Sequence, residues 1–123
     1  MQVGDAFTPR QIDEMVRAAQ QASAQSGLRF SVYIGQSESD PRVYAERLLA
    51  ALGDDAATSV LVLVDPSSRR LEIVTGQTAT KRLDDRACGL ATLSMTSAFS
   101  GGELVGGVVN GLRMLGDSVR VGT

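Results

Sequence analysis

The sequence predicts an α/β domain in which a small mixed sheet is flanked by helices on both faces. The continuous apolar run from Ser59 to Val64 is typical of a central strand buried on both sides. An alternating strand, Leu28 to Gly35, precedes it, and the helical pattern between them predicts a parallel pair joined by a crossover helix. The turn Asp65 to Ser68 and a third strand, Arg70 to Thr75, add an antiparallel hairpin.

The first helix has a clear start signal and a clear stop signal. Thr8 is a candidate N-cap, Pro9 follows at the first helical position, and Gln11 completes a capping box. Gly27 is the expected C-terminal stop. The residues expected on the buried face are Ile12, Met15, Val16, Ala19 and Ala22.

The second helix is expected between the first two strands. Asp40 is a candidate N-cap with Pro41 at the first helical position, and Gly53 is expected to end the helix. The residues expected on its buried face are Tyr44, Leu48, Ala51 and Leu52.

Two further helices are expected after Gly76, which closes the third strand. One covers residues from about 84 to 99, and the other runs from Glu103 to Leu115. Gly106, Gly107 and Gly111 lie inside the last helix, where each costs about 0.5–1 kcal/mol relative to alanine. We therefore expect this helix to pack closely on its neighbour or on the sheet.

Composition excludes several classes of function. The 123 residues are expected to form one domain, residues 1–123, with a net charge of −2 and 4% aromatic residues. Nucleic acid is not expected as a partner, because a basic face and stacking aromatic residues are both missing. Without histidine, Ser-His-Asp and Cys-His catalysis are excluded. The single cysteine, Cys88, excludes an internal disulfide and is expected to be a packed core thiol.

The same sequence predicts no insertion into a membrane. Met1 to Asp5 lack the basic and apolar regions of a signal peptide, and the runs Val60 to Val64 and Leu104 to Val109 are too short to span a bilayer. The chain as given is expected in the cytoplasm. If it is a domain of a longer protein, an exported or membrane-linked location is expected instead.

Short motifs along nearly the whole chain occur in a recognisable order. They are Thr8 to Gln11, Gly27 to Val32, Tyr44-Ala45, Val60 to Val64, Arg69-Arg70, Leu71 to Gly76, Leu83 to Asp85, Phe99 to Leu104, Gly107 and Gly111. In this order they resemble the TPM domain family of thylakoid-lumen, photosystem-associated and membrane-linked proteins. The resemblance is greatest to an actinobacterial branch of unknown function.

This resemblance implies a three-layer α/β/α sandwich with a small mixed sheet. It also implies phosphatase activity or calcium binding, which are reported for some members of the family. The chain departs from the family after Gly76, where many members have a Gly-Tyr-Gly-Leu-Glu type of segment and this chain has Gln77 to Thr80. The aromatic residue and the acid of that segment are missing, as are the signal peptide and membrane helix found in many members.

The candidate site residues are carboxylates at two edges of the predicted sheet. Asp84 and Asp85 are expected at one edge. The carboxyl ends of the parallel strands are expected to bring together, at the other edge, Glu38, Asp40, Asp65 and Glu103. Carboxylates without histidine suit Ca²⁺ or Mg²⁺, and no organic cofactor is expected. The candidate metal ligands are Asp65, Asp84, Asp85 and Glu103.

Each candidate also has a purely structural explanation. Asp40, Asp84, Asp85 and Glu103 fit helix starts, where negative charge is favourable, and Asp65 fits a turn. Ser100-Gly101-Gly102 precedes a helix, so the backbone N–H groups of Gly101 and Gly102 could bind an anion, or form a plain turn between helices. The Arg69-Arg70 pair is expected to be solvated.

Two functions are consistent with these observations. The first is a non-catalytic interaction or regulatory module with a protein partner, steadied by a divalent cation. The alternative is a metal-assisted phosphatase that hydrolyses phosphomonoesters, with the ion at Asp84 and Asp85 or at Asp65 and Glu103. The first is favoured, because the segment after Gly76 lacks the acid and no catalytic residue can be assigned. Carboxylates gathered in one deep pocket would favour the enzyme, whereas carboxylates bonded to separate helix starts would favour the module.

Overall fold

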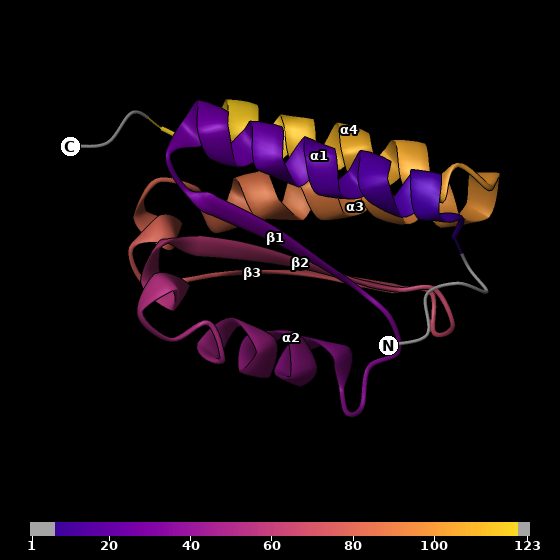
Figure 1. The fold of residues 1–123 in the computed structure, drawn as a ribbon, viewed down its shortest axis with the longest axis horizontal. Helices are drawn as coiled ribbons and strands as arrows, with labels where there is room; N and C mark the ends of the chain where they lie inside the picture. Colours follow the sequence, from indigo (N-terminus) through magenta and orange to yellow (C-terminus); the bar gives the residue numbers. More distant parts are fainter. Residues whose placement is uncertain (1–6, 121–123) are drawn as a thin grey trace.

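The computed structural model describes residues 7–120, except the side chain of Ser100, and has three layers (Figure 1). Helices α1, α3 and α4 cover one face of the sheet, and α2 covers the other. The elements are α1 (Pro9–Ser26), β1 (Arg29–Ile34), α2 (Pro41–Ala50), η1 (Gly53–Thr58), β2 (Ser59–Asp65), β3 (Arg70–Thr75), η2 (Ala79–Lys81), α3 (Asp85–Gly101) and α4 (Leu104–Ser118). The expectation about a signal peptide falls on Met1 to Asp5, outside the described residues.

The three strands form one mixed sheet in the order β1-β2-β3. β1 and β2 are parallel, with Val32 opposite Val62, whereas β2 and β3 are antiparallel, with Val62 opposite Ile73. Every residue of β2 is buried. The predicted fold class, a three-layer α/β/α sandwich with a small mixed sheet, is confirmed.

α1 begins and ends at the predicted signals. The Thr8 hydroxyl accepts a hydrogen bond from the Gln11 N–H at 3.1 Å, and the Gln11 side chain accepts one from the Thr8 N–H at 2.9 Å. Gly27 ends the helix with φ of 82°, a left-handed conformation that glycine adopts without strain. The prediction that Val16 is buried is wrong, because it lies on the flank of the helix and is 39% exposed.

The sheet separates two apolar cores of unequal size. The larger core lies between the sheet and the layer of α1, α3 and α4, and the β2 residues in it are Val60, Val62 and Val64. The smaller core lies between the sheet and α2 and consists of Ala45, Leu61, Leu63 and Val74, with Tyr33, Tyr44, Leu48 and Leu49 packed against it.

α2 begins as predicted but ends earlier. The Asp40 carboxylate accepts hydrogen bonds from two backbone N–H groups of the first turn, at 3.1 and 3.3 Å. The helix ends at Ala50, and the 3₁₀ helix η1 begins at Gly53. The prediction that Ala51 and Leu52 are buried is wrong, because the chain leaves the sheet at this point and both residues are exposed.

α3 and α4 pack closely along the glycines of α4. A Cβ atom on Gly107 would overlap Ala98 of α3, and a Cβ atom on Gly111 would overlap the side chain of Met95. The expected close packing of the last helix on its neighbour is confirmed. Gly106, in contrast, is exposed, and a Cβ atom there would lie 3.9 Å from Oε1 of Glu103, at ordinary van der Waals distance.

Two expectations from composition can be compared with the described residues. Cys88 is buried, and this burial, with the nearby charges of Asp85 and Asp84, raises the pKa of its thiol to about 11. The prediction of a packed core thiol is confirmed. No helix within residues 7–120 combines the length and the apolar character needed to cross a membrane.

The glycines of α4 make a test of this packing. Gly107→Ala is expected to lower the free energy of unfolding by about 1–3 kcal/mol, because the added methyl group must displace Ala98. The adjacent control Gly106→Ala is expected to raise it by about 0.5–1 kcal/mol, because alanine favours the helix and has room. Urea denaturation measures both values, and changes of the same sign would contradict the packing described.

Candidate functional site

A depression of about 670 Å³ opens at the carboxyl edge of the parallel strands. α3 runs antiparallel to β3, so the turn between α3 and α4 lies beside the turn between β2 and β3, as the sequence predicted. The start of α1 completes the depression. Its walls include Phe7, Gln11, Pro66, Arg69, Phe99 and Glu103.

Asp65 is the best-defined carboxylate at this edge. It is 2% exposed at the end of β2. Its oxygens accept hydrogen bonds from the Ser37 N–H at 2.9 Å, the Ser67 hydroxyl at 2.7 Å and the Ser68 N–H at 3.3 Å. Burial raises the pKa of the carboxyl group, but these bonds lower it by more, and the pKa falls from 3.8 to about 2. Asp65 is therefore a charged group whose hydrogen-bond partners are neutral.

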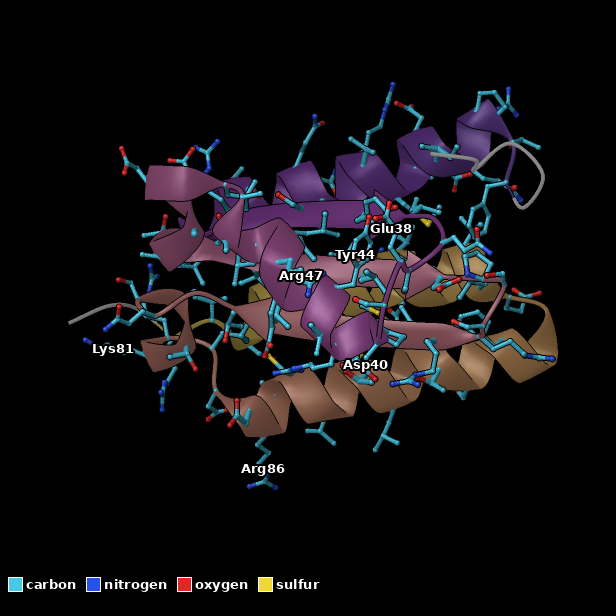
Figure 2. All side chains as sticks on the ribbon, turned by 90° about the horizontal axis from the view of Figure 1, so that it is seen from below. Glu38, Asp40, Tyr44, Arg47, Lys81 and Arg86 are labelled. Carbon is cyan, nitrogen blue, oxygen red and sulfur yellow. The ribbon has the colours of Figure 1, made fainter. Side chains whose placement is uncertain are left out.

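Two tyrosines share this environment with Asp65. The hydroxyl groups of Tyr33 and Tyr44 lie 3.4 Å apart, and the rings meet edge to face with centroids 5.6 Å apart. The hydrogen bond with Tyr44, burial, and the nearby charges of Glu38 and Asp65 raise the pKa of Tyr33 to about 12. Figure 2 shows Glu38 and Tyr44 close to the beginning of α2. Tyr33 is thus neutral at physiological pH and adds no negative charge beside Asp65.

The Ser37 hydroxyl is the one buried polar side-chain atom within residues 7–120 that has no hydrogen-bond partner. It lies close enough to Asp65 to help lower the pKa of that carboxyl group, although it does not meet hydrogen-bond geometry. The loop after β1 therefore approaches Asp65 mainly through the Ser37 backbone.

The Gly101-Gly102 turn ends α3 instead of presenting free donors. Gly102 has φ of 72°, and its N–H and that of Glu103 both donate to the Ala98 carbonyl. Gly101 is the last residue of the helix. Glu103 is exposed and makes no side-chain cap for α4. The donors proposed for an anion are therefore used within the α3 cap, as in the alternative of a plain turn.

Asp84 and Asp85 lie at the opposite edge. The Asp84 carboxylate accepts a hydrogen bond from the Ala87 N–H at 2.9 Å and caps α3, while Asp85 is the exposed first residue of that helix. Gly76 at the same edge packs so closely on η1 that a Cβ atom would overlap the Ala56 carbonyl. A glycine at this position therefore has a structural reason.

The acidic residues do not gather into one site. The sequence suggested that Glu38, Asp40, Asp65 and Glu103 converge, yet no three acidic or cysteine side chains within residues 7–120 come together in a way that would hold a metal ion. The candidate ligands are divided between two edges, and Asp40, Asp65 and Asp84 are each bonded to a nearby backbone.

Arg69, at the carboxyl edge, is exposed as the sequence predicted, and it also contacts α3, which the sequence did not show. It has a φ of 58°, which is unusual for a residue other than glycine, and its guanidinium donates to the Phe99 carbonyl at 3.1 Å. A cation near the C-terminus of a helix is favourable. The sequence signal was only a basic residue after a turn, because its acceptor lies on α3.

The layers define the class of protein: a small α/β/α domain with a three-stranded mixed sheet. The chain belongs to the family described as "Domain of unknown function (DUF5130)", whose model matches residues 2–116. It is also 30% identical, over 95 residues, to the uncharacterised proteins MT2543 and Rv2468c of two Mycobacterium tuberculosis strains. The match covers 77% of this chain and 56% of each relative, so the chain spans just over half their length.

Solved structures of bacterial proteins have similar folds. The BA42 protein of Bizionia argentinensis has a TM-score of 0.81 at 18% identity, with 95% of this chain and 83% of that chain covered. The N-terminal domain of the cg2496 protein of Corynebacterium glutamicum has a TM-score of 0.78 at 18% identity, with 99% and 80% covered. At these identities the likeness establishes the fold alone.

The charge of Asp65 makes a test of this edge. Asp65→Asn is expected to lower the free energy of unfolding by about 2 kcal/mol at neutral pH. The reason is that the NH2 group of the asparagine would face an N–H or O–H group that now donates to the carboxylate. The folded pKa of about 2 lies below the unfolded value of 3.8, so the stabilisation is complete above the unfolded value. It is lost as the pH falls through about 2. Urea denaturation across this range measures it, and a difference that does not shrink with acid would contradict the assignment.

Proposed function

We propose that this chain is a TPM-like domain that acts as a non-catalytic interaction or regulatory module for a protein partner. The observation that carries the proposal is the use of the acidic side chains. Asp40 and Asp84 cap helices, and Asp65 holds the loops at the carboxyl edge together. These carboxylates stabilise the fold, and a reaction would need them free.

In this proposal Ca²⁺ or Mg²⁺ has a supporting part. Asp84 and Asp85 are exposed neighbours at the start of α3, and hard cations prefer such carboxylate oxygens. An ion bound there would stabilise the start of the helix and would take no part in a reaction. The alternative, a metal-assisted phosphatase, requires more: Asp84 must release the Ala87 N–H, or Asp65 must release its three donors, before either supplies a full ligand set.

The deciding experiment joins an NMR titration with an activity assay. Amide spectra are recorded with increasing Ca²⁺ and Mg²⁺, and hydrolysis of p-nitrophenyl phosphate is measured with each ion. We compare the wild type with the double variant Asp84→Asn/Asp85→Asn. The matched control is Asp54→Asn/Asp55→Asn, an exposed aspartate pair in η1.

The expected result is no hydrolysis above the rate of the double variant, with amide shifts limited to the start of α3. Because asparagine is also a good N-cap, the double variant is expected to stay folded. Hydrolysis that depends on the ion, survives in the control and disappears in the double variant would overturn the proposal and establish the phosphatase.

A further inference from the structure

One edge of the sheet carries backbone groups that face away from the neighbouring strand. β3 is an outer strand, and the Gly76 N–H donates to the Ser59 carbonyl of the β2 side. By alternation, Leu71, Ile73 and Thr75 direct their backbone groups outward. The Ile73 carbonyl confirms this direction, because it accepts from Nη1 of Arg42 on α2 at 3.0 Å. Within residues 7–120, this is the one hydrogen bond recorded for these outward groups.

A groove of about 650 Å³ runs along this edge. β3 forms its floor, Arg42 stands on one side, and α3 forms the other side; in Figure 2, α3 lies beyond β3 rather than over the centre of the sheet. Leu90 and Leu93 line it and are 53% and 70% exposed, the two highest values among the exposed large apolar residues. Three residues apart on α3, they lie on one helix face.

The geometry of the groove indicates which kind of ligand it would bind. Alternating outward donors and acceptors are matched by an extended backbone, which would add a fourth strand beside β3. A second copy pairing its own β3 here would bring two α3 helices to the same face of one continuous sheet, where each already extends past its strand. The charged lining is balanced, with Arg42 and Arg86 against Glu72 and Asp85, so a polyanion finds no basic surface.

We infer that the groove between β3 and α3 binds an extended segment of a partner protein by strand addition. The segment has apolar side chains at alternate positions that pack on Leu90 and Leu93. Arg42 competes with the segment for the edge of β3, because its guanidinium must leave the Ile73 carbonyl before the segment can pair there. After it leaves, the guanidinium can remain paired with the carboxylates of Glu46 and Glu72. This inference rests on the proposed function and adds the surface and the chemistry of the partner.

The test uses a random twelve-residue peptide library displayed on phage and selected against the whole chain. The dissociation constants of the selected peptides are then measured by fluorescence polarisation. Leu93→Lys is expected to weaken binding at least tenfold, whereas Val16→Lys, at an exposed valine on α1 away from the groove, is expected to change it less than twofold. Arg42→Ala is expected to tighten binding on the order of fivefold, because one competing hydrogen bond is removed.

Amide hydrogen exchange locates the bound peptide. The expected result is slower exchange at the Ile73 and Thr75 N–H groups and period-two apolar alternation in the selected peptides. Peptides whose binding is unaffected by Leu93→Lys, or that slow exchange elsewhere, would overturn the assignment of the binding site to this groove. The proposed function as an interaction module would then still stand. Failure to select any peptide would also overturn this assignment. Neither result depends on the phosphatase assay, in which metal-dependent hydrolysis would overturn the proposed function itself.

Discussion

Burial of β2 on both faces is the constraint on which the rest of the structure depends. A strand without a polar face needs a layer on each side, and this chain supplies α2 on one side and the helices α1, α3 and α4 on the other. The backbone of β2 must also be satisfied, which requires a neighbouring strand at each edge. The three-layer arrangement follows from these two requirements.

The packing of the three helices on one face of the sheet determines the surroundings of the edge strand β3. α4 can approach α3 closely because Gly107 and Gly111 have no side chain to keep the helices apart. α1 packs on β1 and α3 on β3, with α4 between the two helices. This places α3 at the outer side of the sheet. Leu90 and Leu93 of α3 are exposed there and line the groove along β3. The groove is therefore a consequence of how the helices share one face.

The carboxylates show how similar residues acquire different roles through their surroundings. Asp65 is buried and held charged by three neutral donors, whereas Asp84 is exposed and bonded to the first turn of α3. Both stabilise the positions of loops and helix starts. This structural use of the carboxylates is the reason that the function we propose is an interaction module and not a phosphatase.

The helices and strands of this protein could be predicted from its sequence because their signals act over a few residues: the capping box at Thr8, the left-handed stop at Gly27, and the unbroken apolar run of β2. The surroundings of the candidate site residues could not be predicted in this way. Whether the carboxylates gather into one cluster, what Arg69 bonds to, and which strand edge stays open depend on contacts between residues far apart in the chain. Such contacts leave no local pattern, since hydrogen-bond partners are set by packing in three dimensions.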